Sequence, residues 1–248
     1  TSEHDPSDTR KKVLEDVINE AVSDGGTLMI PSFALERTQD LLYHLNELFG
    51  EGKIPRVPVF LDSPLAIRLT NVYHKYTHYF NKEAQSYIKN GDNIFDFPGL
   101  QITITSELSK AIADVPSPKI IIAGSGMSHG GRIVHHEKRY LPDPKSMLLF
   151  IGYQAHGSLG RRLLDGAKTA RMYGDEVVIN AKRRKITSYS AHADRTKLLQ
   201  WVGSMKGSVK KVFLTHGEQS KSEALAVEIT EQLGLETHVP TRGETISL

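Results

Sequence analysis

Short apolar runs alternate with helix-like stretches through the first two thirds of the chain, and this alternation constrains the fold more than any other feature. The apolar runs, each too short for a helix, cover residues 27–30, 57–61, 120–123 and 147–151. Stretches with helical spacing follow them at residues 35–48, 64–80, 130–140 and 158–165. Continuous apolar strands that alternate with amphipathic helices indicate parallel βα units, with helices on both faces of the sheet. The predicted fold class is α/β.

The two ends of the chain follow a different pattern. A helix is predicted over residues 7–23, because capping signals at residues 5–8 are followed by apolar residues at helical spacing, and Gly25 and Gly26 end this pattern. Beyond residue 172, paired strands are expected at 176–179 and 185–189, around a basic turn at 182–185. The remaining predicted elements are a helix at 194–203, a strand at 211–214, a helix at 219–233 and a strand near 244–247. A soft domain boundary is placed at 172/173.

The composition is that of a soluble globular protein, with 39% hydrophobic and 24% charged residues among 248. The absence of cysteine excludes disulfides, thiolate zinc sites and cysteine nucleophiles, so any metal must use His, Asp or Glu. No apolar run approaches the roughly 20 residues of a membrane span, and no signal peptide opens the chain. A cytoplasmic protein is expected. Since the sequence begins at Thr1 without a Met, we expect an excised fragment.

Positive charge is distributed unevenly along the chain, although the net charge is only +2. Residues 119–185 hold 13 Lys and Arg against 5 Asp and Glu, whereas the rest holds 18 against 24. A basic stretch in an otherwise acidic chain favours a localised contact with a polyanion. A solvated surface explains the same charge equally well.

Polar motifs stand where the predicted strands end. They begin at Ser32, Asp62, Gly124, Gly152 and Thr215. In open α/β sheets, functional groups lie beyond the carboxyl ends of the strands. We therefore expect these motifs to gather at one edge of the sheet.

The segment from Ser190 to Asp194 follows a predicted strand and opens a helix. Asp194 can cap that helix, and backbone amides at such a corner can bind an anion. His192 lies at this corner, where a histidine could donate a proton to a leaving oxygen. A packed or capping histidine is the alternative.

His216 ends the predicted strand at 211–214, so its imidazole suits metal ligation, and Glu218 could orient it. Gly217 would let the backbone turn tightly. A catalytic zinc needs about three protein ligands, and the chain has no His-x-His or His-Glu-x-x-His motif. His135 and His136 point about 100° apart on a helix, so they are expected at the surface. An intact metal centre is not expected.

Two further segments suit phosphate and RNA. Ser125, Gly126 and Met127 belong to a glycine-rich loop between a strand and a helix, which can point backbone amides at phosphate or simply reverse the chain. The loop matches neither the P-loop nor the dinucleotide-binding spacing. The next strand is followed by Tyr153, an amide, and the pair Arg161 and Arg162. An aromatic ring and arginines together suit the backbone of a single-stranded nucleic acid. The arginines could equally be solvated charges on a helix.

Taken in order, these motifs resemble the β-CASP family of metallo-β-lactamase-type nucleases, the group that contains ribonuclease J and the pre-mRNA 3′-end endonuclease. The motifs that carry the resemblance are IPSFALER at 30–37, LDSPLA at 61–66, SGM at 125–127, GYQ through DG at 152–166, SAHAD at 190–194 and THGE at 215–218. Several motifs in a fixed order are far more specific than any one of them.

The resemblance implies a β-CASP domain over residues 8–172 and, over 173–248, the C-terminal part of a metallo-β-lactamase αββα core without its metal-binding half. It implies that His192 stabilises the scissile phosphate or protonates the leaving 3′ oxygen, and that His216 binds one of two zinc ions. It also implies that the other zinc ligands precede Thr1. The parent would hydrolyse RNA by two-metal chemistry, and this fragment alone would be inactive.

The expected partner is single-stranded RNA and no membrane, and the parent could form a homodimer. Asp194 stands where ribonuclease J-like exonucleases tend to have serine, and its charge would repel a terminal phosphate, so endonucleolytic cleavage is favoured. DNA as substrate stays open. A non-catalytic RNA-binding scaffold of the same family is the main alternative. A small-molecule enzyme that binds a nucleotide cofactor is disfavoured by the glycine spacing.

Overall fold

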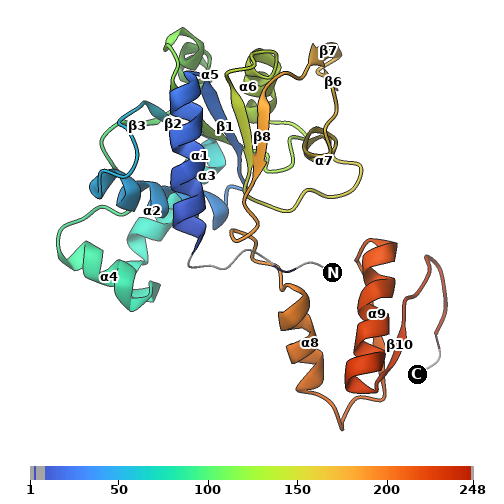
Figure 1. Ribbon diagram of the computed structural model, residues 1–248. Helices are drawn as coiled ribbons and strands as arrows, with labels where there is room; N and C mark the ends of the chain where they lie inside the picture. Colours follow the sequence, from blue (N-terminus) through green and yellow to red (C-terminus); the bar gives the residue numbers. More distant parts are fainter. Residues whose placement is uncertain (1–2, 4–8, 247–248) are drawn as a thin grey trace. The chain divides into compact units, whose positions relative to one another are not determined.

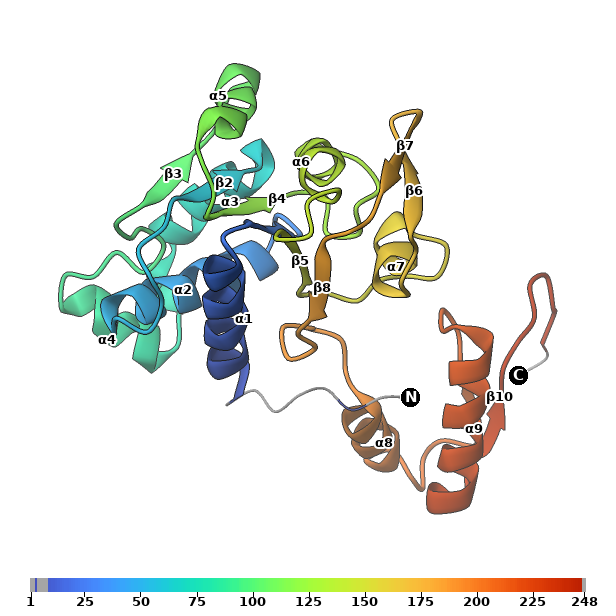
Figure 2. The ribbon, with the colours of Figure 1, turned by 45° about the horizontal axis from the view of Figure 1, so that its top comes forward.

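The computed structural model describes Glu3 and residues 9–246, and it divides into two compact units between Tyr189 and Ser190. The larger unit contains a parallel sheet in the order β3-β2-β4-β1-β5-β8, whose strands are labelled between Figure 1 and Figure 2. Its strands are β1 (Thr27–Pro31), β2 (Val59–Asp62), β3 (Leu100–Ile102), β4 (Lys119–Ala123), β5 (Met147–Phe150) and β8 (Lys182–Lys185). The predicted α/β class and the four predicted apolar strands are confirmed.

Helices cover both faces of this sheet, as predicted. One face carries α1 (Arg10–Asp24), α2 (Arg37–Gly50), α3 (Pro64–Lys75) and α4 (Lys82–Lys89). The other face carries α6 (Arg132–Tyr140), α7 (Leu159–Leu164) and the 3₁₀ turn Ile112–Asp114. Helix α5 (Ser106–Ala111) directly precedes that turn. Alternate strand residues point to opposite faces. Leu28 and Ile30 accordingly pack into the core beneath α1 and α2, whereas Met29 packs into the core beneath α6. Burial on both faces explains the continuous apolar runs.

The predicted hairpin around residues 182–185 is wrong. These residues form the edge strand β8, which pairs in parallel with β5, while β7 (Asp175–Val178) pairs antiparallel with β6 (Thr169–Met172). Charged residues suit an edge strand, and here they have partners. Lys182 Nζ lies 3.0 Å from Glu20 and 2.6 Å from Asp24 of α1, and Arg184 Nη2 lies 2.7 Å from Glu20.

The smaller unit contains α8 (Arg195–Gly203), β9 (Lys211–Phe213), α9 (Gln219–Leu233) and β10 (Glu236–His238). Helix α9 packs beside β10 (Figure 2), and β10 pairs in parallel with β9. The strand predicted near 244–247 is wrong for residues 244–246, and residue 247 lies outside the described residues. Glu244 instead accepts hydrogen bonds from His238 Nε2 (2.6 Å) and Thr241 N (2.8 Å), which hold a turn.

The compact units do not divide at the predicted boundary of 172/173. Strand β8 extends the main sheet, so the described residues from 9 to 189 belong to the larger unit, while Glu3 belongs to the smaller one. The boundary at 172/173 stays a prediction about the family's domains. The capping residues predicted at 5–8 lie outside the described residues, and α1 begins at Arg10. Among the described residues, no helix combines the length and apolarity that a membrane crossing requires.

Candidate functional site

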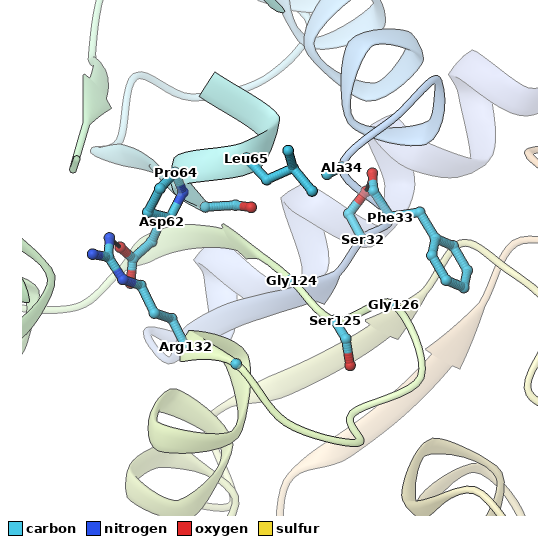
Figure 3. A pocket seen from close by; sticks show the side chains of 12 residues that line it. Ser32, Phe33, Ala34, Asp62, Pro64, Leu65, Gly124, Ser125, Gly126 and Arg132 are labelled. Carbon is cyan, nitrogen blue, oxygen red and sulfur yellow. Dashed lines mark hydrogen bonds and ion pairs between the residues drawn. The ribbon is translucent and has the colours of Figure 1, made fainter. Parts of the chain in front are cut away.

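A pocket of about 520 Å³ lies at the carboxyl ends of β1, β2 and β4 (Figure 3). Parallel neighbours end at the same edge of a sheet, so segments distant in sequence meet there. The pocket is lined by Ser32, Phe33, Ala34, Asp62, Ser63, Pro64, Leu65, Gly124, Ser125, Gly126, Gly131 and Arg132. The predicted gathering of polar motifs is confirmed for these strands. His216 follows β9, which belongs to a separate sheet.

Asp62 is the most heavily hydrogen-bonded group at the pocket. Its Oδ1 accepts hydrogen bonds from Thr103 Oγ1 (2.7 Å) and Arg132 Nη1 (2.8 Å). Its Oδ2 accepts one from Ser109 Oγ (2.6 Å) and lies 2.7 Å from His136 Nε2. The carboxylate is fully buried, so these donors replace the water that it loses on folding.

This network keeps the Asp62 carboxylate ionised. Burial alone raises the pKa of Asp62, but the hydrogen bonds that it accepts, first of all from His136, outweigh burial and lower the pKa to about 2. Arg132 also donates to the carbonyl oxygens of Thr103 (2.7 Å) and Ile104 (2.9 Å). The guanidinium thus ties the end of β2 to the segment that follows β3.

The expectation that His136 is a surface residue is wrong. Its side chain is buried against Asp62, because Arg132 and His136 are four residues apart on α6 and share one helical face. His135 points elsewhere, and its ring stacks on Tyr173 with the ring centroids 4.6 Å apart.

The glycine-rich loop after β4 folds back on itself. Ser125 N donates to Gly130 O (3.2 Å), and Ser128 N donates to Ser125 O (3.1 Å), so part of the predicted set of phosphate-facing amides is used inside the loop. Gly131 has a φ of +74°, and a β-carbon there would lie 2.6 Å from Gly124 O. Only glycine can close the loop at this point.

Gln154 holds the loop from behind. Its buried amide donates to Gly126 O (2.9 Å) and Gly152 O (3.2 Å). Gly160 N donates to Met127 O at 3.0 Å, and a β-carbon on Gly160 would lie 1.9 Å from Gln154 Oε1. The amide predicted to contact RNA is therefore a structural brace.

Glu137 is a second buried group behind the loop. The hydroxyl of Ser128 donates to Glu137 Oε1 at 2.5 Å. Burial raises the pKa of Glu137 to about 8, against a smaller opposing effect of the Ser128 hydrogen bond. The carboxyl is therefore protonated at neutral pH in the folded protein.

Glu137 should make the protein less stable as the pH rises from about 4.5 to about 8. The folded state keeps a proton that the unfolded state releases, so the free energy of unfolding should fall by up to about 1.4 kcal/mol per pH unit from this group. Glu137→Gln should remove that decline, as measured by urea unfolding across this range. Glu83→Gln, on exposed α4, is the matched control. Equal slopes in the unaltered protein and Glu137→Gln would contradict the assignment.

More than half of the positive charge in residues 119–185 is engaged inside the larger unit. Lys119 is buried and donates to Ile112 O at 2.7 Å, and Arg183 donates to Ala167 O at 2.9 Å. The carboxylate pairs are Arg132 with Asp62, Lys138 with Asp175, Arg161 with Asp165, Lys182 with Glu20 and Asp24, and Arg184 with Glu20. The charge count along the sequence therefore overstates the cations available to a polyanion.

Tyr153, Arg161 and Arg162 differ in exposure, and none of them lines the pocket. Arg161 is half-buried, and its Nε donates to both carboxylate oxygens of Asp165, at 2.8 and 2.7 Å. Tyr153 is half-buried, and Arg162 is exposed. Of the predicted phosphate-binding residues, the pocket brings together only Ser125 and Gly126.

In the smaller unit, the segment from Ser190 to Asp194 forms the predicted helix start. Asp194 Oδ1 accepts a hydrogen bond from Lys197 N (3.0 Å), which confirms the cap of α8. Ser190 Oγ accepts one from His192 N (3.3 Å). His192 itself is exposed, as a group that acts on a large substrate must be.

His216 is exposed and has a φ of +64°, so the left-handed residue of this turn is the histidine and not Gly217. Gly217 leaves room for Ser222: a β-carbon there would lie 2.3 Å from Ser222 Oγ, so that hydroxyl would have to turn away. Glu218 Oε2 lies 3.0 Å from Lys221 Nζ. That Glu218 orients His216 stays a prediction.

The described residues do not by themselves fit a zinc site. Within Glu3 and residues 9–246, no three His, Asp or Glu side chains are grouped closely enough to hold a metal ion. A catalytic zinc needs about three protein ligands. His216 could supply one ligand at most.

Asp62, His136 and Glu137 are site residues to which the sequence assigned no role, whereas Gln154 was assigned to RNA contact and is a brace instead. Asp62 stood at the end of a predicted strand, and the spacing of Arg132 and His136 marked one helical face, so both signals were present. Nothing in the sequence distinguishes Glu137 from a surface glutamate.

The fold and the pocket define an α/β protein with its polar residues at the carboxyl edge of a parallel sheet, followed by a small unit that presents two exposed histidines. Its residues 38–163 match the Beta-Casp domain, and residues 176–240 match the Zn-dependent metallo-hydrolase RNA specificity domain. The chain belongs to the β-CASP family of metallo-β-lactamase-fold ribonucleases, which are RNA-processing hydrolases.

Three curated relatives illustrate the range of the family. Ribonuclease TTHA0252 of Thermus thermophilus is 39% identical over 88% of this chain and 49% of its own length. Transcription termination factor FttA of Methanosarcina mazei is 32% identical over 96% of this chain and 38% of its own. The RNase J-like protein of Methanocaldococcus jannaschii is 33% identical over 97% of this chain and 54% of its own length. The chain thus spans about half the length of these relatives or less.

Proposed function

We propose that this chain is the RNA-holding side of a zinc-dependent ribonuclease. The observation that carries the proposal is the pocket at the carboxyl edge of the sheet, where the Ser32, Ser63 and Ser125 segments meet. Small hydroxyl residues and a glycine-rich backbone let a phosphodiester approach closely. The relatives named as ribonucleases support the proposal.

Six of the predicted site residues have the following roles in this proposal. His192 stabilises the scissile phosphate or donates a proton to the leaving 3′ oxygen, and Ser190 lies beside it. Ser125, Gly126 and Met127 form the loop that faces the RNA backbone. His216 supplies one ligand to zinc, a metal that activates water and neutralises charge on phosphate, and the other ligands would come from residues beyond this chain.

Binding by the 248-residue chain tests this proposal. We expect single-stranded RNA to bind with an affinity that falls steeply with salt, because phosphate contacts release counterions. We expect no cleavage when zinc is added, since the described residues lack a complete ligand set. Fluorescence anisotropy of labelled RNA, repeated at several salt concentrations, measures the first expectation. No binding at about 50 mM salt would contradict the proposal.

Arg162→Ala should weaken this binding and reduce its salt dependence by about 0.7 log units per log unit of salt, which is the effect of one lost phosphate contact. Arg161→Ala is the matched control, because Asp165 already engages that guanidinium, and it should have the smaller effect. Anisotropy titrations of the two variants measure the difference. Equal losses would contradict the assignment of Arg162 as the contacting residue.

We propose endonucleolytic cleavage. The carboxylate of Asp194 supports it, because a negative charge beside His192 would repel a terminal 5′-phosphate. A circular RNA has no ends, so a protein that combines this chain with its metal-binding half should cut it. If only linear RNA were degraded, the enzyme would be an exonuclease.

A non-catalytic RNA-binding scaffold is the second candidate, favoured by the lack of a metal cluster among the described residues. It predicts RNA binding without cleavage even in a full-length protein. In either case we propose a cytoplasmic protein, and we propose a homodimer for the parent, which sedimentation of the full-length protein would test.

A further inference from the structure

Residues 64–82 form a positively charged segment without a single carboxylate. They contain Arg68, Lys75 and Lys82, and no Asp or Glu. All three cations are exposed, and none is ion-paired with another described residue. This contrasts with the basic stretch at 119–185, where more than half of the charge is engaged within the fold. Three exposed cations are therefore available close together in the sequence, two on α3 and one at the start of α4.

The outer face of α3 also carries an exposed apolar stripe. Leu65 is 60% exposed, Val72 46% and Tyr76 52%, and Tyr79, in the 3₁₀ turn Thr77–Tyr79, is 77% exposed. Leu65, Arg68, Val72 and Tyr76 follow one another at intervals of three or four residues, which places them on one helical face. Large apolar side chains in a row on the surface mark a binding surface more often than isolated ones do.

Three aromatic rings at the end of this stripe contact one another. The ring centroids of His78 and Tyr79 are 4.2 Å apart, and those of Tyr76 and Tyr79 are 6.3 Å apart. Gln85 Nε2 fixes the turn by donating to His78 O (3.1 Å) and Phe80 O (2.7 Å). The rings are thus a preformed aromatic platform, and little freedom would be lost when a ligand stacks on it.

The stripe is continuous with the pocket. Pro64 and Leu65, the first residues of α3, line the pocket, as Figure 3 shows. Helix α3 has 12 residues, so it extends roughly 18 Å from the pocket toward the aromatic platform. A ligand held in the pocket could follow the stripe outward.

We propose that Leu65, Arg68, Val72, Lys75, Tyr76, His78 and Tyr79 form a track for single-stranded RNA that leaves the pocket along α3. Cations without carboxylates suit a phosphate backbone, and the exposed rings suit unpaired bases, which stack on aromatic side chains regardless of sequence. The track rests on the proposed RNA-binding function and names the path of the strand.

Two variants of the 248-residue chain test the track by anisotropy with a single-stranded RNA of about 10 nucleotides. Tyr79→Ala should weaken binding roughly 10-fold through loss of a stacked base, whereas Tyr79→Phe should retain it. Arg68→Ala combined with Lys75→Ala should lower the salt slope by about 0.7 per cation. Lys110→Ala on α5, an exposed lysine outside the track, is the control and should change neither quantity.

The outcomes separate the track from the proposed function. If the unaltered chain binds no RNA, the proposed function fails, and the track fails with it. If it binds RNA, and Tyr79→Ala and the double variant bind with unchanged affinity and slope, the track alone is overturned and the stripe serves a protein instead. Circular dichroism spectra that match the unaltered chain would show that these surface variants fold.

Discussion

In a protein that combines this chain with the proposed metal-binding half, His192→Ala should lower the rate of RNA cleavage by about 10²–10⁴-fold, the usual contribution of a general acid. RNA binding should change little, because His192 is one exposed side chain among many contacts. Single-turnover cleavage and anisotropy measure the two quantities separately. The loss should appear in kcat and not in KM.

Asp194→Asn is the control for this variant, because asparagine also caps helices and leaves α8 intact. It should retain cleavage of a circular RNA close to that of the unaltered protein, because the proposed role of the Asp194 charge concerns only RNA that ends in a 5′-phosphate. If His192→Ala cleaved RNA at the unaltered rate, His192 would be the packed or capping histidine of the alternative interpretation.

Asp62→Ala should lower the free energy of unfolding by about 3–5 kcal/mol, because it leaves the Arg132 guanidinium without its buried partner. The hydroxyls of Thr103 and Ser109 also lose their acceptor. Urea unfolding of the 248-residue chain, followed by circular dichroism, measures the change. Asp16→Ala, which removes an exposed ion pair with Lys12 on α1, should change stability little.

The same carboxylate predicts acid sensitivity. The pKa of Asp62 is about 2 in the folded protein and 3.8 in the unfolded reference, so the folded state favours the ionised form. Its contribution of about 2 kcal/mol is fully present above pH 4 and is lost as the pH falls toward 2. Asp62→Ala should flatten the stability curve in that interval. If the free energies of unfolding of the variant and the unaltered chain changed in parallel with pH, the hydrogen-bond network around Asp62 would be contradicted.

At residues 182–185 the structure differs from what the sequence pattern predicts. Four consecutive cations predicted a solvated turn, yet they form the edge strand of the main sheet. The deciding partners are Glu20 and Asp24, about 160 positions earlier in the chain. The order of neighbouring residues carries no information about an ion pair with so distant a partner. The basic stretch at 119–185 therefore suggested a larger surface for binding a polyanion than the fold provides.

The sequence by itself determined the α/β class, the four apolar strands, most of the helices and the order of motifs that identifies the family. These features are local, since strand and helix periods are fixed by a few neighbouring residues. Tertiary structure alone decided that Asp62 meets Thr103, Ser109, Arg132 and His136, and that Gln154 braces the glycine-rich loop. Such contacts exist only after parallel strands pair and bring their carboxyl ends to one edge.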